Sequence, residues 1–208
     1  STIPLTTAVR LMDPPPPPEV MEAAQSIRFR GMILVYLILG TDRFTEYDAH
    51  YFPELSIPIS RMSEPKNYNS ATGPAGKTIL CAELPCDPGE RWWDMSDEDL
   101  GRHFCDWLKG VGLPVNVPVI GCQTRRLANA YPVYDLDYQR HFETVDRWLL
   151  GLEGFLSFGR QGLFAHDNTH HAFAMAYGAA DSLTPGGGID HARWAAHRKD
   201  FESHRVED

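Results

Sequence analysis

The chain has 208 residues, enough for one or two domains that each bury a hydrophobic core. It carries 19 lysine and arginine residues against 28 aspartate and glutamate residues, so its formal net charge is −9. An acidic chain without a basic cluster repels phosphate backbones, which excludes a typical nucleic-acid-binding protein. The longest wholly apolar run, residues 32–39, is far shorter than the roughly 18 to 20 residues that cross a bilayer, so we expect neither a membrane helix nor a signal peptide.

The number and spacing of the cysteines indicate whether they form disulfides or bind zinc, and so in which cell compartment the protein is expected. They lack the CxxC pairs typical of zinc sites, and they are too few for a scaffold held together by disulfides. They are Cys81, Cys86, Cys105 and Cys122. We expect these thiols to be reduced and the protein to be cytoplasmic.

The first part of the chain predicts a connector, a helix and a strand. Residues 1–4 are β-like, and 14–18 are consecutive prolines that form a stiff polyproline II connector. Good helix formers follow over 19–27, with a proline at the helix entry. Residues 32–39 are continuously apolar, which predicts a strand buried on both faces.

The middle of the chain predicts a sheet and a helix. Strands are expected over 56–62, 77–84 and 115–120, and together with the first strand they indicate an antiparallel or mixed sheet. Ser96 begins a capping sequence for a helix whose apolar residues recur at helical spacing.

The last part of the chain predicts three helices and an extended segment before the second of them. Residues 138–152 repeat apolar side chains at helical spacing, and 162–165 are expected to be extended. Residues 166–168 then form a capping turn for a helix over 169–183. The charged tail, 190–208, is expected to be a single surface helix.

The most informative stretch is 159–183, because its helix is lined with alanine and glycine. Small side chains allow another group to come close, and the free N–H groups and the dipole of a helix start attract negative charge. From spacing alone, the simpler interpretation is that Asp167 or Asn168 is an N-cap and that the helix packs tightly.

Three histidines near this helix start are candidate metal ligands. His166 and His170 are four residues apart, with His171 beside them, a spacing that binds zinc on a helix. However, His166 precedes the cap, and the acid of an HExxH motif is missing. We therefore expect no metal.

Gly159-Arg160, residues 162–164 and Asp167-Asn168, followed by the small-residue helix, resemble the C-terminal FAD-binding segment of the flavin amine oxidase superfamily. That superfamily includes protoporphyrinogen oxidase-like oxidoreductases and UDP-galactopyranose mutase. Four further segments resemble it in the same order along the chain. They are 1–5, a strand end; 29–31, a strand start; 61–65 with Asn67 and 76–78, a hairpin; and 130–134, an aromatic segment.

The resemblance implies an α+β fold, in which a mixed-sheet substrate domain with helices joins the final strand and helix of a Rossmann-like FAD domain whose first half is absent from this chain. The implied division has four parts. They are the end of an FAD-domain strand and a Pro-rich connector (1–18), the substrate-binding domain (19–152), the C-terminal FAD-binding strand and helix (153–185) and a charged tail (186–208).

The resemblance also implies FAD as cofactor and assigns residues to it. The N–H groups of Thr169, His170 and His171 would lie beneath the pyrimidine edge of the flavin and stabilise the charge that reduction builds there. The remaining assignments are Gly159, Arg160, Asp167 and Asn168 to the cofactor, and Arg61 and Tyr131 to the substrate. No catalytic side chain is expected, because the chemistry belongs to the cofactor.

The GxGxxG motif of the superfamily, which cradles the FAD pyrophosphate, does not occur in the sequence. The chain also begins at Ser1 without a methionine. We therefore expect a second chain, or a segment cut off before Ser1, to carry the missing half. A lone copy would expose part of a nucleotide-binding sheet, and we expect that it does not fold and function alone.

The function implied is that of an FAD-dependent oxidoreductase whose flavin accepts a hydride from a bound small molecule. A sugar mutase is the alternative within the superfamily, although residues 165–168 replace the aromatic-rich stretch of the mutases. Outside enzymes, the alternative is a non-catalytic half-domain that stabilises a partner chain.

Overall fold

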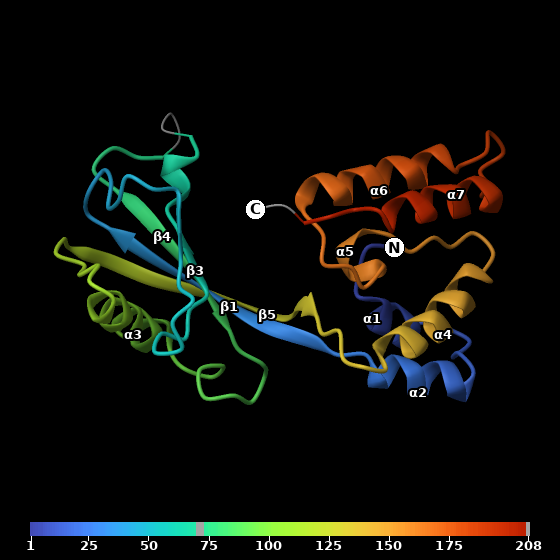
Figure 1. Ribbon diagram of the computed structural model, residues 1–208, viewed down its shortest axis with the longest axis horizontal. Helices are drawn as coiled ribbons and strands as arrows, with labels where there is room; N and C mark the ends of the chain where they lie inside the picture. The colour runs from blue at the N-terminus through green and yellow to red at the C-terminus, as the bar shows by residue number, and fades with distance from the viewer. Residues whose placement is uncertain (70–72, 207–208) are drawn as a thin grey trace. The chain divides into compact units, whose positions relative to one another are not determined.

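The computed structural model describes residues 1–69 and 73–206, and it contains two compact units. Unit 1 comprises Ser1–Phe29 and Tyr131–Asp208, and unit 2 comprises Arg30–Ala130. The chain enters unit 2 along strand β1 and leaves it along strand β5 (Figure 1). The two units are defined by their compactness alone. The predicted division into substrate-binding and FAD-binding parts therefore stays a prediction.

Unit 2 is built on a five-stranded antiparallel sheet in the order β2-β3-β4-β1-β5. The strands are β1 (Phe29–Leu39), β2 (Ala49–Tyr51), β3 (Arg61–Ser63), β4 (Thr78–Pro85) and β5 (Val119–Pro132). In the ladders, Tyr36 lies opposite Cys81, and Arg61 lies opposite Glu83. The predicted α+β class is confirmed, and the sheet is antiparallel rather than mixed.

One face of this sheet is buried by helix α3 (Asp97–Gly110), which runs along one side of it in Figure 1. The side chain of Ser96 caps α3 by accepting a hydrogen bond from the N–H of Asp99, as predicted. Along β1 the residues alternate, so that the buried set faces α3 and the half-exposed set lies on the other side, called here the open face. The buried residues are Ile33, Val35, Leu37 and Leu39, and the open-face residues are Leu34, Tyr36 and Ile38. The prediction that this strand is buried on both faces is therefore wrong.

A buried carboxylate fastens the loop that precedes β2 to the end of β3. Glu64 is 1% exposed, and its two oxygens accept hydrogen bonds from the N–H groups of Phe44 and Thr45, both at 2.9 Å. The Thr78 hydroxyl donates to the same carboxylate at 2.6 Å, and the Asn67 amide, in the short helix η1 (Pro65–Asn67), donates at 3.3 Å. The buried charge is thus satisfied by four donors.

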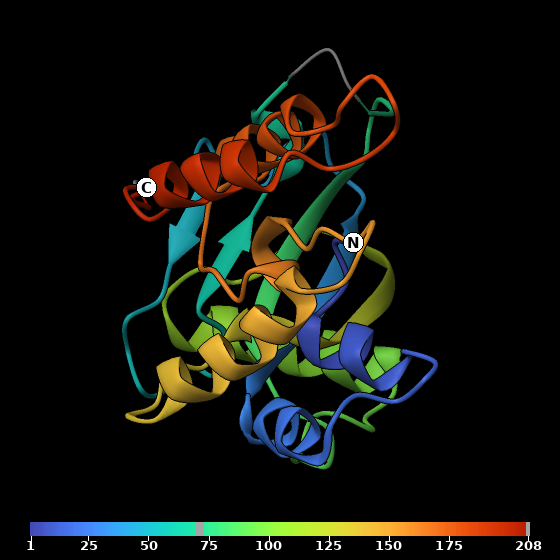
Figure 2. The same ribbon diagram turned by 90° about the vertical axis from the view of Figure 1, so that its right-hand side faces the viewer.

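Unit 1 is helical. Its helices are α1 (Leu5–Arg10), α2 (Pro18–Ser26), α4 (Tyr138–Leu150), α5 (Gly159–Gly162), α6 (Thr169–Asp181) and α7 (His191–Phe201). Helices α1, α2 and α4 share a core in which Leu5, Val20 and Val145 are buried together with Phe164. Helix α7 runs beside α6 in both Figure 1 and Figure 2.

Several predicted elements are confirmed, and others begin later than expected. Four predicted elements are present, and each of their ends lies within two residues of the prediction. They are the helices over 19–27, 138–152 and 169–183 and the strand over 77–84. The strand predicted from residue 56 begins only at Arg61, and the strand predicted from 115 begins at Val119. Proline explains both delays, because Pro58 and Pro118 have no N–H to donate to a ladder.

Two short segments predicted as extended are not strands. After Pro4 the chain turns directly into α1, which the sequence did not predict. Residues 162–165 close a turn after α5, in which the N–H of Ala165 donates to the carbonyl of Arg160 at 2.9 Å. The final strand expected for a Rossmann-like domain is therefore not formed before α6.

The predicted surface helix at the C-terminus is shorter than the tail and partly buried. Helix α7 ends at Phe201, and Trp194 is only 1% exposed because it packs inside unit 1. The last residues of that prediction, 207–208, lie outside the described part of the chain. No helix formed by the described residues is both long and apolar enough to cross a membrane.

Candidate functional site

The start of α6, where the cofactor was predicted, is held by a reciprocal capping box. The side chain of Asn168 accepts a hydrogen bond from the N–H of His171, and Nδ1 of His171 accepts one from the N–H of Asn168 at 3.2 Å. The N–H of His171 is therefore engaged within the protein. Among the described residues, the backbone N–H groups of Thr169 and His170 have no acceptor, as is usual for the first residues of a helix.

Three side chains that can bind protons or metals meet beside this cap. Asp167 Oδ1 lies 3.4 Å from Nδ1 of His171, and Asp167 Oδ2 lies 3.7 Å from Nδ1 of His204. The rings of His171 and His204 are stacked, with centroids 4.3 Å apart and planes inclined by 13°. A metal ion lies near the plane of each imidazole that binds it, and two nearly parallel rings cannot both meet this condition. The arrangement therefore fits two stacked imidazoles beside a carboxylate better than a metal site, and Nδ1 of His204 has no hydrogen-bond partner among the described residues.

Arg160 and Tyr131, predicted for the cofactor and the substrate, lie against each other in unit 1. The guanidinium carbon of Arg160 is 5.1 Å from the centroid of the Tyr131 ring, close enough for a cation–π interaction. The ring of His166 meets Tyr131 edge-on at 5.0 Å. Nε of Arg160 is buried and has no hydrogen-bond partner among the described residues. One donor of this guanidinium is thus unpaired within the described part of the chain.

The backbone between α5 and α6 is held by Tyr134, which sequence reasoning did not assign to the site. Its hydroxyl donates to the carbonyl of Phe164 at 3.1 Å and accepts from the N–H of His166 at 2.9 Å. Phe164 has a φ of 51°, a conformation that costs energy for a side chain of this size. Burial raises the pKa of Tyr134, so the phenol stays protonated and able to donate.

Gly159, at the start of α5, also has a positive φ, as Phe164 does. Its φ of 79° lies in the left-handed region, which glycine enters without steric cost. Gly159 is buried, so it shapes the chain next to Arg160 rather than presenting a surface.

The small residues of α6 divide between two sides of the helix. On one side a Cβ at Gly178 would lie 2.9 Å from the ring of Phe201 and 3.1 Å from that of His197, so α7 is the group that comes close. On the other side, Phe173 and Tyr177 are 62% and 75% exposed, with Ala174 exposed beside them. One side of α6 is therefore packed, and the other is an apolar surface open to a partner.

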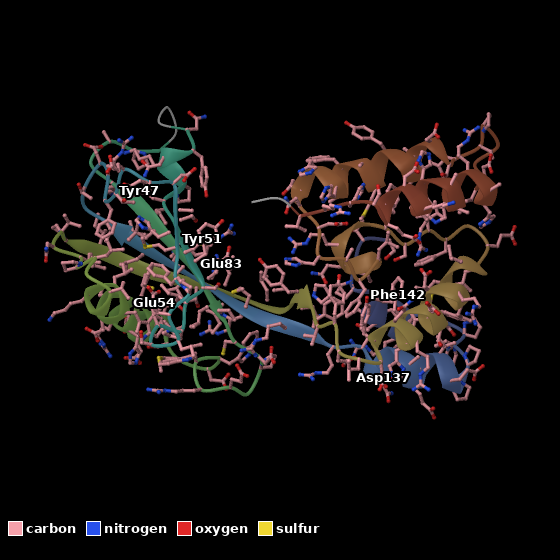
Figure 3. All side chains as sticks on the ribbon, viewed as in Figure 1. Tyr47, Tyr51, Glu54, Glu83, Asp137 and Phe142 are labelled. Carbon is pink, nitrogen blue, oxygen red and sulfur yellow. The ribbon has the colours of Figure 1, made fainter. Side chains whose placement is uncertain are left out.

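Arg61 lies in unit 2, at the first residue of β3 on the open face of the sheet. Its Nε donates to Oε1 of Glu83 on β4 at 3.0 Å, and its guanidinium lies 5.9 Å from the ring of Tyr51 on β2. Figure 3 labels Tyr51 and Glu83 on the strands that flank β3. Burial alone would lower the pKa of the Arg61 guanidinium, but its hydrogen bonds to Glu83 and Tyr51 outweigh that effect and raise it.

Comparison with known proteins gives matches to solved structures only. No protein-family model matches the sequence, and neither does any curated protein. A reduced UDP-galactopyranose mutase matches 99% of this chain with a TM-score of 0.75 and 17% sequence identity. A protein of Exiguobacterium sp. 255-15, assigned as a protoporphyrinogen oxidase, matches 72% of the chain with a TM-score of 0.52 and 19% identity.

The resemblance predicted from sequence is thus confirmed at the level of the fold. The two solved structures are named for the same kinds of protein that the landmark segments resemble. The match covers 44% of the mutase chain and 32% of the other chain, so this chain spans less than half of the length of either.

Proposed function

We propose that this chain is the part of an FAD-dependent oxidoreductase that holds the substrate and one edge of the flavin. The observation that carries the proposal is the start of α6, where two N–H groups have no acceptor among the described residues and which follows the segment that brings Arg160 against Tyr131. Support also comes from the fold, which is similar to that of UDP-galactopyranose mutase over nearly the whole chain.

The residues at the start of α6 fit an electron-accepting ring that becomes negatively charged on reduction. The N–H groups of Thr169 and His170 donate to negative charge, and the helix dipole adds to their effect. Arg160, whose Nε has no hydrogen-bond partner among the described residues, adds a positive charge in the same unit. Bound FAD would supply the hydride-accepting chemistry itself.

The function requires a second part of the protein. The chain has no GxGxxG motif, so the pyrophosphate of FAD must be held by other residues. The exposed side of α6, with Phe173 and Tyr177, is the apolar surface on which we place that second part, whether it is another chain or the continuation of this one. Tyr131 on β5 and Arg61 on β3 are the residues that we assign to the substrate.

The proposal is tested by isolating the chain from its native source through an affinity tag. We expect GxGxxG either in a co-purifying polypeptide or in a longer form of the tagged chain, and a flavin absorbance band that is lost when Arg160 is replaced by glutamine. The matched control is Arg140→Gln, on the exposed surface of α4, which should keep the flavin. A colourless complex would contradict the proposal and support the non-catalytic half-domain.

The same preparation separates the oxidoreductase from the sugar mutase. An oxidoreductase consumes its substrate together with an electron acceptor such as oxygen. A mutase isomerises its substrate only after reduction of the flavin and consumes no net electrons.

A further inference from the structure

The open face of the sheet in unit 2 carries an apolar pocket where β1 ends and β4 begins. Tyr36 and Ile38 project from β1 on this face, and Ile79 is the ladder partner of Ile38, so the two isoleucines lie side by side. Ile79 is 41% exposed, a large apolar side chain that solvent reaches. The pocket above these residues has a volume of about 380 Å³, which is within the range of small-molecule sites.

The wall of this pocket is held in place by Lys66 of η1. Its Nζ donates to the carbonyls of Pro74 and Lys77 at 3.1 and 3.0 Å, and it pairs with Asp42 at 3.3 Å. The carboxylate of Asp42 also accepts a hydrogen bond from the N–H of Gly76 at 2.6 Å. The backbone of residues 73–77 is therefore fixed beside the apolar floor without any ligand.

The mouth of the pocket is positively charged. A second hollow of about 380 Å³ shares Lys66 and Gly73 with the first and adds Arg43 to its lining. Arg43, Lys66 and Lys77 give three positive charges around the two hollows, against the negative charges of Asp42 and of the buried Glu64, which binds Thr78 of the lining, although the whole chain has a net charge of −9. Within residues 1–69 and 73–206, no acidic side chain pairs with Arg43 or Lys77.

We propose that this pocket binds a small ring-bearing anion. The ring packs on Tyr36, Ile38 and Ile79, where burial of apolar surface favours it. The anionic group, a carboxylate, sulfonate or phosphate, lies at the mouth against Lys77 and Arg43. This site belongs to unit 2 alone and does not depend on the proposed flavin function.

The proposal is tested by calorimetric titration of the full chain, together with any polypeptide that co-purifies with it. The probe is 2-naphthoate, and the matched probes are 2-naphthylmethanol, which keeps the rings without the charge, and inorganic phosphate, which keeps a charge without the rings. We expect saturable binding of one naphthoate per chain, weaker binding of the alcohol, and binding of naphthoate that weakens with added salt. Absence of saturable naphthoate binding would overturn the proposal, as would an equal affinity for phosphate.

Variants locate the site. Lys77→Glu should weaken naphthoate binding about fivefold or more, because it removes one charge and adds a repelling one. Ile79→Asp should weaken both naphthoate and the alcohol, because it removes apolar floor. The control is Lys109→Glu at the exposed end of α3 in the same unit, which should change nothing. Circular dichroism checks that each variant is folded; if Lys77→Glu and Lys109→Glu bind naphthoate equally well, the pocket is not the site.

Discussion

Arg61 and Glu83 face each other across the β3–β4 ladder and are joined by an ion pair on the open face of the sheet. Nε of Arg61 donates to Oε1 of Glu83 at 3.0 Å, and a terminal nitrogen of the guanidinium contacts the same oxygen. A guanidinium held in this way has donors left over, but its charge is already partly balanced. In the proposed function, Glu83 therefore balances part of the charge that Arg61 presents to a substrate.

The first prediction concerns the strength of this pair. Replacement of both residues by glutamine, singly and together, should show a coupling free energy of about 0.5 to 1 kcal/mol in urea unfolding. The value is modest because the Arg61 side chain is 36% exposed, so water screens the pair. The matched control pairs Arg61→Gln with Glu98→Gln on α3, where the two effects should simply add. If the effects of the single replacements add in the Arg61–Glu83 cycle as they do in the Arg61–Glu98 control, the contact contributes nothing to stability.

The second prediction concerns the buried carboxylate of Glu64. Glu64→Gln puts an amide group where donors from Phe44, Thr45 and Thr78 converge, so at least one donor loses its acceptor. The free energy of unfolding should fall by about 1 to 3 kcal/mol. Thermal or urea unfolding measures it, with Glu54→Gln, on the exposed loop before β3, expected to stay within about 0.5 kcal/mol of the parent protein. A loss no larger than that of the control would mean that the network is dispensable.

The fold could be predicted from the sequence where local patterns decide it. The Ser96 cap and the helix periodicity of α4 are both set by residues close in the chain. The burial of β1 was predicted wrongly, because a continuous apolar run looks the same whether one or both faces are covered. Only the position of α3, which comes from residues far along the chain, decides that Tyr36 is left half-exposed.

The candidate site could be predicted only in part, for a similar reason. Residues 159–171 were assigned to the cofactor because they follow one another in the order of the segment that they resemble, and this assignment stays a prediction. Tyr134 and His204 were missed because their contacts, to Phe164 and to Asp167, join segments that are distant in sequence. The small-residue pattern of α6 indicated a close approach, but it could not say that α7 packs against Gly178.

The third prediction concerns the capping box at the start of α6. His171→Leu removes the acceptor for the N–H of Asn168, which should destabilise the first turn by about 1 kcal/mol. His171→Gln keeps an acceptor at that position and should restore most of the loss. Amide hydrogen exchange at Asn168 and the first residues of α6 measures the effect directly. If leucine and glutamine variants exchange at the same rate, the histidine is not the group that holds the turn.

The fourth prediction concerns the pH dependence of stability through Cys122. Burial raises the pKa of this thiol to about 11, with the charge of Asp97 and the neighbouring Cys105 acting in the same direction, against an ordinary value of 9.0. In the unfolded chain the thiol therefore loses its proton at lower pH than in the folded protein. Between about pH 9 and 11 the unfolded state binds fewer protons, so the free energy of unfolding should fall as the pH rises through this window.

Below pH 9 both states keep the proton, and Cys122 should contribute no pH dependence. Cys122→Ala should make the fall between pH 9 and 11 shallower without abolishing it, because burial also raises the pKa of other thiols such as Cys81 and Cys86. An alanine at Cys81 should leave the contribution of Cys122 in place. Urea unfolding at pH 7, 9 and 10.5 provides the comparison. Alkylation supplies an independent readout, because a thiol that stays protonated reacts slowly with iodoacetamide at pH 8. Rapid alkylation of Cys122 in the folded protein at that pH would contradict the raised pKa and the stability profile together.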